Sequence, residues 1–96
     1  DQVLNLIKES LSRNVQIEFD YTANSSTEIL KRNADPLGLC FYNLHWHLIA
    51  FCHLRNDYRD FRVDRISHLK LTAVRFKPSQ YSTLKEYVNN LVRTTE

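Results

Sequence analysis

Glycine is nearly absent from this chain of 96 residues, in which Gly38 is the one example. A glycine-rich loop needs several glycines to bring its backbone close to a phosphate, so the sequence excludes that kind of nucleotide site. Cysteine is scarce as well, and Cys40 and Cys52 are too few for a disulfide scaffold. We expect both to be reduced, buried thiols of a cytoplasmic protein. The longest stretch without charge, 36–54, carries three histidines and a tryptophan, so no membrane span is predicted.

The residues that are abundant predict one compact domain. Hydrophobic residues make up 43% of the chain and include five phenylalanines and five tyrosines, enough for a single core. The net charge is only +2, but its distribution is uneven. Residues 55–77 hold seven basic side chains against three aspartates. This segment predicts a face that binds polyanions without an extreme isoelectric point.

Hydrophobic periodicity predicts a helix followed by a strand at the beginning of the chain. Val3, Ile7 and Leu11 recur every four residues within 2–13, and Asp1 is placed to cap that helix. Residues 15–22 alternate strictly between apolar and polar side chains, which indicates a half-buried strand.

The rest of the chain predicts further strands and a closing helix. The expected elements, in order, are a turn at 22–26, a strand over 27–35 with a bend at Asp35–Pro36, extended chain over 39–42, a tight turn from 43, a central strand over 45–54, a turn at 55–57, strands over 58–66 and 68–76, and a helix over 83–92. Short antiparallel strands in sequence favour a small five-stranded barrel, since closure removes exposed edges. The fold class is therefore mainly β with a helix at each end.

The stretch from 45 to 66 holds three of the four histidines, the only tryptophan and four arginines. A zinc site is the first interpretation, because His45 and His47 are two residues apart on a strand and point to one face. Zinc needs three or four protein ligands, and Cys52 has the opposite parity. The spacing Cys40-x4-His45-x-His47-x4-Cys52 matches no familiar metal motif. We expect no metal site and no cofactor.

Catalysis is the second interpretation. A cysteine nucleophile needs a histidine base and an orienting acid, and no motif in the sequence places such groups together. We expect neither an enzyme nor catalytic residues.

The run of arginines from Arg55 to Arg65 allows two further interpretations. Strand parity places Arg59, Phe61, Val63 and Arg65 on one face and Tyr58, Asp60, Arg62, Asp64 and Ile66 on the other. In one interpretation this is a solvated strand, with Arg62 paired to Asp60 or Asp64. In the other, the planar guanidinium groups bind phosphate, and nearby aromatic rings such as Trp46 stack on bases. The sequence leaves both open.

The same residues resemble the WYL domain family in three separate blocks. They are "RNADPLGL" (32–39), "WHLIAFCHLR" (46–55) and "RDFRVDRI" (59–66), in the order and spacing of the family pattern. The tail "RFKPSQYSTLKEYV" (75–88) resembles the exit from such domains. The resemblance covers roughly residues 14–88. One position departs from the pattern, because His47 stands where the family has its eponymous tyrosine.

The resemblance implies a fold and a site. The fold is an SH3-like or Sm-like five-stranded barrel, here divided into an N-terminal helix (1–13), a WYL-like barrel (14–77) and a C-terminal helix or exit linker (78–96). The family's arginines and aromatic residue line the proposed ligand site. At matching positions of this sequence, the resemblance implicates Trp46, His47, Arg55, Arg59, Arg62 and Arg65.

The resemblance also implies a function. Such domains sense an effector for bacterial transcription regulators, usually behind a helix-turn-helix module, and single-stranded nucleic acid is the leading candidate effector. We therefore expect a cytoplasmic sensor that binds single-stranded nucleic acid or a similar anionic ligand. The alternatives are a structural or homodimerisation module without an effector and a sensor of a small molecule.

Overall fold

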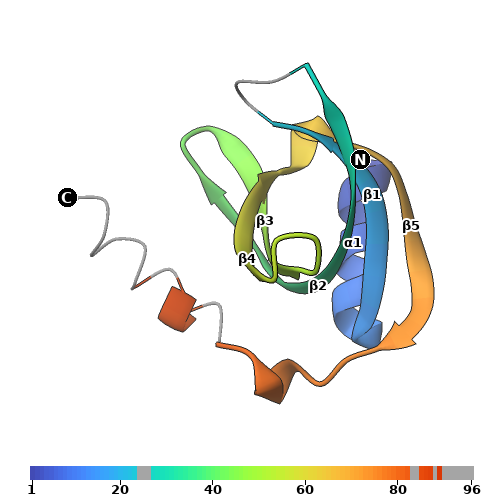
Figure 1. Ribbon diagram of the computed structural model, residues 1–96. Coiled ribbons are helices and arrows are strands. Elements are labelled where there is room, and N and C mark those ends of the chain that lie inside the picture. Colours follow the sequence, from blue (N-terminus) through green and yellow to red (C-terminus); the bar gives the residue numbers. More distant parts are fainter. Residues whose placement is uncertain (24–26, 83–84, 88, 90–96) are drawn as a thin grey trace.

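A five-stranded antiparallel sheet dominates the computed structural model, which describes residues 1–23, 27–82, 85–87 and 89 (Figure 1). The strands pair in the order β4-β3-β2-β1-β5. Their bounds are β1 (Val15–Thr22), β2 (Ile29–Tyr42), β3 (His45–Cys52), β4 (Asp57–Arg62) and β5 (Ile66–Arg75). The mainly β fold class and the antiparallel succession of strands are thus confirmed.

The sheet is not closed into a barrel, which corrects the prediction of an SH3-like or Sm-like barrel. Strands β4 and β5 lie at opposite ends of the strand order, and no ladder joins them in the described part of the chain. A 3-10 turn, η1 (Val63–Arg65), ends the extended backbone between them. The backbone N–H of Arg62 donates to the hydroxyl of Tyr21 on β1 at 3.0 Å. The hydroxyl of Tyr21 therefore bonds the backbone of the last residue of β4. In a closed barrel, the backbone of a neighbouring strand would take this position.

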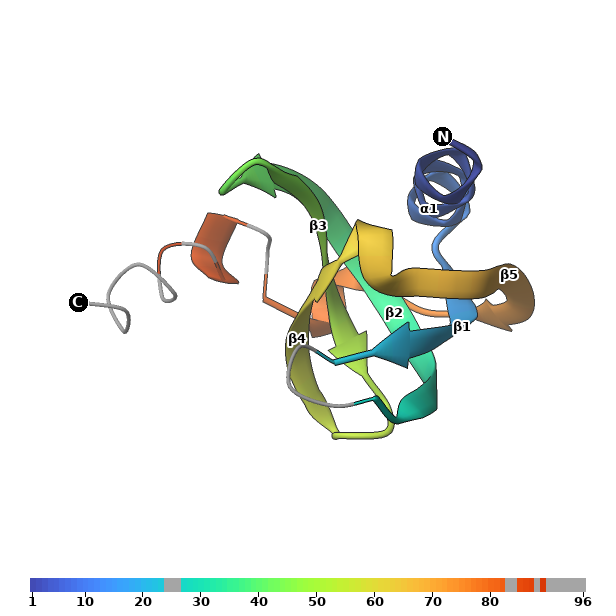
Figure 2. The same cartoon turned by 90° about the horizontal axis from the view of Figure 1, so that it is seen from above.

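The helix α1 (Gln2–Arg13) begins at its predicted cap and covers part of the sheet. The carboxylate of Asp1 accepts hydrogen bonds from the N–H groups of Val3, at 2.8 Å, and Leu4. The helix lies against β5, β1 and β2, and its residue Ile7 is fully buried in the core (Figures 1 and 2). Within the described residues, no helix is long and apolar enough to cross a membrane.

Several strand boundaries differ from the prediction, and two of these differences follow from local backbone chemistry. Strand β2 continues through Pro36, where a bend had been predicted, and a register shift between Pro36 and Gly38 accommodates the proline. Proline has no N–H to donate, so an irregularity in the ladder is the expected cost. Strand β4 stops at Arg62, since η1 follows it. That turn changes the phase of the side chains, and Ile66 is buried instead of sharing a face with Arg62.

The chain leaves the sheet after β5 ends at Arg75 and continues through the 3-10 turn η2 (Pro78–Gln80). Residues 85–87 and 89 are helical. The remainder of the predicted helix over 83–92 lies outside the described residues, as do residues 24–26 of the predicted turn at 22–26. In both views the helical residues 85–87 lie across the molecule from α1 (Figures 1 and 2).

A buried carboxylate ties this exit segment to the sheet. The side chain of Asp35 on β2 is only 3% exposed. It accepts hydrogen bonds from the hydroxyl of Tyr81 at 2.5 Å and from the amide of Gln16 at 3.0 Å, and His53 Nε2 lies 3.1 Å away. The ring of Tyr81 also stacks on Phe51, with centroids 5.0 Å apart. Burial and the neighbouring Asp35 raise the pKa of Tyr81, so its proton stays on the hydroxyl. Side chains from β1, from the residue after β3 and from the exit segment therefore meet at the carboxylate of Asp35.

This arrangement predicts that Tyr81→Phe destabilises the fold. The variant removes the donor and leaves a buried carboxylate oxygen with one partner fewer, so we expect the free energy of unfolding to fall by about 1–3 kcal/mol. Urea denaturation followed by circular dichroism measures this change. Tyr87→Phe removes a hydroxyl from the same aromatic surface without touching Asp35 and is the matched control. Equal stability of the two variants contradicts the role given to the Asp35 contact.

Candidate ligand-binding site

The predicted site residues concentrate on β3 and β4, and the pairing of these strands decides which of them meet. His47 is directly opposite Arg62 in the antiparallel register, and Ala50 is opposite Arg59. Side chains opposite each other share a face of the sheet, whereas residues three apart on a strand point to different faces. The register therefore brings Arg62 to the face of His47 and directs Arg59 to the other face.

His47 lies beneath a tyrosine and is bound to a carboxylate. Its Nδ1 is 2.7 Å from Asp60 Oδ1, and its ring stacks on that of Tyr42 with centroids 3.8 Å apart. The hydroxyl of Tyr42 donates to the second oxygen of Asp60. Burial, followed by Asp60, raises the pKa of Tyr42. His47 is only 7% exposed and Tyr42 is 40% exposed, so the ring that solvent reaches is that of Tyr42.

The second nitrogen of His47 has no hydrogen bond in the described part of the chain. Its Nε2 is buried, although a neutral imidazole with a proton on Nδ1 would offer a lone pair there. A ligand can reach this nitrogen only if Tyr42 or a neighbouring side chain moves. His47 is therefore better placed to hold Tyr42 and Asp60 in position than to contact a ligand directly.

Arg62 forms a two-pronged ion pair with Asp64, the first acidic residue of η1. Its Nε and Nη2 lie 3.0 Å and 2.6 Å from the two carboxylate oxygens. His45 completes the group, with Nδ1 3.4 Å from Arg62 Nη2 and 3.7 Å from Asp64 Oδ2. The hydrogen bonds from Arg62 hold the pKa of Asp64 below its usual value, and Asp64 in turn raises the pKa of Arg62. Of the two carboxylates suggested by the sequence, Arg62 pairs with Asp64.

A hollow with a cavity volume of about 210 Å³ opens beside this ion pair. It lies between the start of α1, the turn that joins β2 to β3, and η1. Phe41 and Trp46 contribute aromatic rings that meet edge to face with centroids 5.3 Å apart, and they are 57% and 42% exposed. The other lining residues are Asp1, Leu4, Leu44, His45, Val63 and Asp64. The hollow thus has aromatic walls and polar groups at its rim.

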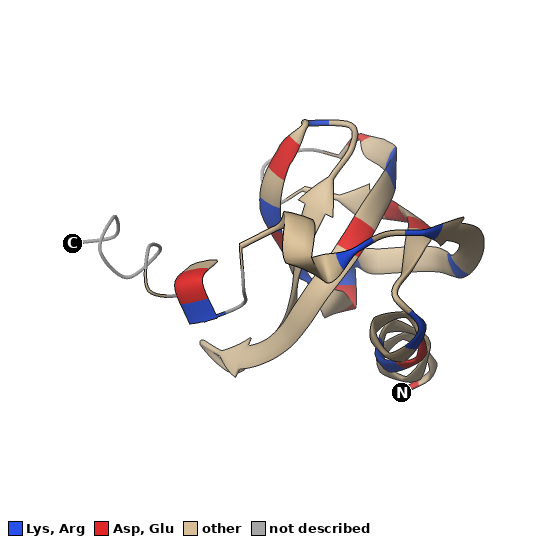
Figure 3. Ribbon diagram, turned by 90° about the horizontal axis from the view of Figure 1, so that it is seen from below, with Lys and Arg blue, Asp and Glu red and all other residues tan. Residues whose placement is uncertain are grey.

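The remaining predicted arginines are not gathered at this hollow. Arg55 is exposed in the turn between β3 and β4. Arg59 donates to the backbone oxygen of Tyr58 at 2.8 Å and contacts Asp57 at 3.3 Å. Arg65 follows Asp64 in η1 and contributes to the lowered pKa of that carboxyl group. In Figure 3 the positions of Lys and Arg (blue) and of Asp and Glu (red) are interspersed along the described strands.

Comparison with known proteins identifies the family. The model of the WYL domain matches residues 2–71. The chain belongs to the WYL domain family. It is 36% identical over 80 residues to YobV of Bacillus subtilis, described as an uncharacterized HTH-type transcriptional regulator, with 81% of this chain and 25% of that protein covered. It is 33% identical over 64 residues to the DNA-binding transcriptional repressor CapW of Escherichia coli, with 67% of this chain and 21% of CapW covered.

A solved structure with a similar fold supports the architecture. The proteasome accessory factor PafBC of Arthrobacter aurescens matches with a TM-score of 0.74 at 24% identity, over 85% of this chain and 13% of that chain. This chain spans about a quarter of the length of YobV and about a fifth of the length of CapW. The relatives named here are transcription regulators or accessory factors by description, and none is described as an enzyme.

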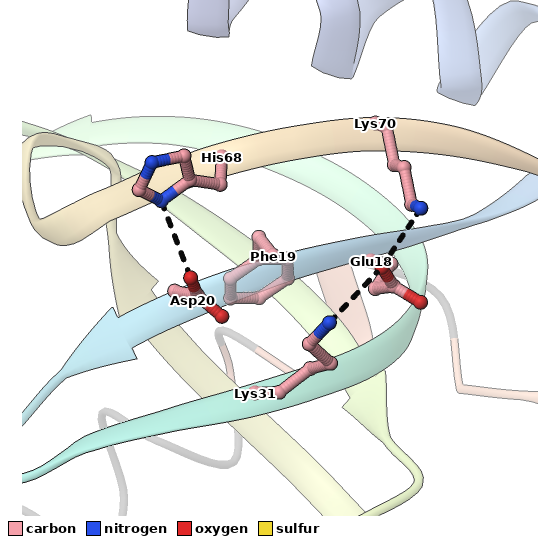
Figure 4. A pocket seen from close by; sticks show the side chains of 6 residues that line it. All are labelled: Glu18, Phe19, Asp20, Lys31, His68 and Lys70. Carbon is pink, nitrogen blue, oxygen red and sulfur yellow. Dashed lines mark ion pairs between the residues drawn. The ribbon is translucent and has the colours of Figure 1, made fainter.

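A second hollow of the WYL domain, about 380 Å³ in volume, lies across β2, β1 and β5 (Figure 4). Glu18 at its centre contacts Lys31 at 3.5 Å and Lys70 at 3.3 Å, and His68 lies 3.2 Å from Asp20. Lys70 is the main cause of the lowered pKa of Glu18. The dashed contacts in Figure 4 join these side chains across three strands, and the two lysines and two carboxylates that line the hollow balance in formal charge.

Sequence reasoning missed several side chains that shape the site. Asp60 and Tyr42 hold His47, and Phe41 forms a wall of the hollow. The sequence suggested Tyr42 as a stacking ring and Asp60 as a possible partner of Arg62, but it indicated neither their contacts with His47 nor the position of Phe41. The buried guanidinium of Arg32 was also missed. It lies 5.9 Å from the ring centroid of Tyr21 and 5.7 Å from that of Phe61. Its place in the block "RNADPLGL" was the available signal.

Metal binding finds no support in this geometry. Within the described residues, no group of three or more histidine, cysteine, aspartate or glutamate side chains is arranged to hold a metal ion. His45 and His47 do share a face of β3, but they contact different carboxylates, Asp64 and Asp60.

The ion pair predicts a measurable shift in the titration of Asp64. Arg62→Ala removes the hydrogen bonds that lower the pKa of this carboxyl group, so its pKa should rise toward the ordinary value of 3.8. A pH titration of the side-chain carboxyl carbon by NMR measures the change. Arg59→Ala, which removes the partner of Asp57, should leave Asp64 unaffected. An unchanged titration of Asp64 in Arg62→Ala contradicts the pairing.

Proposed function

We propose that this WYL domain is the effector-sensing part of a bacterial transcription regulator and that it binds single-stranded nucleic acid or a similar anionic ligand. The descriptions of YobV and CapW as transcription regulators support the first part. The observation that carries the second part is the guanidinium of Arg62, which binds Asp64 through two nitrogens, while Asp64 itself lines a hollow together with Phe41 and Trp46. Arginine forks bind phosphate, and exposed aromatic rings stack on bases.

Each predicted site residue has a role in this proposal. Arg62 binds a phosphate, Trp46 stacks on a base, and Arg65 adds positive charge beside the fork. His47 acts indirectly, because it is covered by Tyr42 and keeps that exposed ring in place. Arg55 and Arg59 lie further along β4 and its preceding turn. Arg55 contacts only a ligand long enough to extend along the strand, as a single strand of several nucleotides does. Arg59, on the other face of β4, is reached only if that ligand also wraps around this edge strand.

Binding regulates transcription only if it is coupled to a DNA-binding module. We propose that a helix-turn-helix module accompanies this domain, as the description of YobV indicates for that relative. The ligand then shifts the module between two orientations by binding one of them more tightly than the other. Such a regulator acts in the bacterial cytoplasm, where its DNA target is.

Fluorescence anisotropy with a labelled oligo-dT strand tests this function. We expect binding that weakens as salt is raised, because phosphate contacts release counterions, and a loss of roughly tenfold in affinity for Arg62→Ala. Lys8→Ala removes a positive charge from an exposed position on α1 and is the matched control for net charge. Absence of binding by the wild-type domain at low salt rules out single-stranded DNA as the effector.

A dimerisation module is the second candidate, and one observation favours it. Leu44, at the turn between β2 and β3, is 85% exposed beside the exposed rings of Phe41 and Trp46. Exposed apolar groups of this kind often mark an interface. Light scattering over a concentration series separates the cases. A mass that doubles in the wild type but not in Leu44→Asp supports dimerisation through this turn, and a constant monomer mass excludes it.

A further inference from the structure

Asp64 binds the arginine that the proposed function assigns to the ligand. Both carboxylate oxygens of Asp64 are used, at 3.0 Å and 2.6 Å from two different nitrogens of Arg62. A phosphate presents two oxygens to a guanidinium in the same manner. The carboxylate therefore occupies the Nε/Nη2 edge of the guanidinium, and a phosphate cannot bind this edge at the same time.

The ion pair is placed where an external anion can displace it. The side chains of Arg62 and Asp64 are 29% and 52% exposed, and ion pairs between side chains this exposed are weak. Asp64 stands on the short turn η1, and the sheet ladder does not hold its backbone. His45 Nδ1, 3.4 Å from Arg62 Nη2, offers a further polar group to an anion that arrives there. Exchange of one anion for another is thus sterically and energetically accessible.

The surroundings of Asp64 indicate what kind of anion fits. Asp64 lines the same hollow as Phe41 and Trp46. An anionic group that replaces its carboxylate on Arg62 holds any attached group at the mouth of this hollow. An aromatic group is suited to the exposed rings there, which meet edge to face at 5.3 Å. The matching chemistry is a phosphate joined to a flat ring, as in one nucleotide unit.

We propose that Asp64 is an internal competitor that occupies the fork of Arg62 until a phosphate-bearing aromatic ligand displaces it. The inference rests on the proposed function and adds to it a residue that sets affinity and a ligand class of nucleotide type. In this arrangement Asp64 keeps the affinity for anions low and selects ligands that contact both the guanidinium of Arg62 and the aromatic hollow. Inorganic phosphate contacts only the guanidinium.

Asp64→Asn tests the competition because it keeps the shape of the side chain and removes its charge. Thymidine 5′-monophosphate, thymidine and inorganic phosphate are titrated into the wild type and the variant, and the Nε–H signal of Arg62 is followed by NMR. We expect Asp64→Asn to bind the monophosphate about fivefold more tightly than the wild type, a change in the range of an exposed ion pair. Inorganic phosphate should also bind Asp64→Asn more tightly than the wild type, but more weakly than the monophosphate does. Thymidine should leave the Arg62 signal unchanged.

Asp57→Asn is the matched control. It makes the same change in net charge and also removes the carboxylate partner of an arginine, but Arg59 lies on the other face of β4 and contacts Asp57 with one nitrogen only. Amide signals of Val63 and Ile66 report whether η1 keeps its conformation in Asp64→Asn. The double variant Arg62→Ala, Asp64→Asn should lose the tighter binding of the monophosphate that we expect for Asp64→Asn alone.

The outcomes separate this inference from the proposed function. Tighter binding of the monophosphate in Asp64→Asn than in both the wild type and Asp57→Asn supports the competition, even if the labelled oligo-dT does not bind and single-stranded DNA is excluded. Equal or weaker binding in Asp64→Asn overturns it, and so does an equal gain in Asp57→Asn, whatever the oligonucleotide does.

Discussion

The antiparallel register of β3 and β4 is the constraint on which the candidate site depends. A slip of one residue in this pairing would send every side chain of β4 to the opposite face. Phe61 prevents it, because its ring is buried and packs edge to face against Phe19 and Tyr21, at 5.1 Å and 4.9 Å. With Phe61 turned into the core, Asp60 and Arg62 must point to the outer face. The contacts to His47 and Asp64 follow from that placement.

The outer face illustrates how a domain with many arginines keeps its charges balanced. Arg62 on β4 and the two lysines beside Glu18 each have a carboxylate within ion-pair distance. Such exposed pairs add little to stability. In the function proposed above, a phosphate has to displace the carboxylate of Asp64 from Arg62 before it can bind the same edge of that guanidinium.

The exit segment meets strand β4 on the outer face of the sheet. Tyr58 follows the turn after β3 and accepts a hydrogen bond from the N–H of Ser82 at 2.9 Å, and it lies two residues before Asp60 on the same side of β4. The exit segment held by Asp35 and Tyr81 therefore rests on the strand that carries Arg62. This continuity gives a physical connection between the candidate site and the exit segment. The connection consists of packed rings and hydrogen bonds on a single strand.

The sequence by itself determined the helix at 2–13 with its Asp1 cap, the strand at 15–22 and the succession of antiparallel strands, because periodicity and capping act over a few neighbouring residues. The family blocks likewise placed Trp46, His47 and Arg62 on adjacent strands. Only the tertiary structure decided that the sheet stays open, because a 3-10 turn and the Tyr21 hydroxyl satisfy the end of β4 locally. It alone showed His47 covered by Tyr42 and Arg62 held by Asp64. Burial and ion pairing depend on which residues become neighbours across strands, and the one-dimensional pattern does not contain that information.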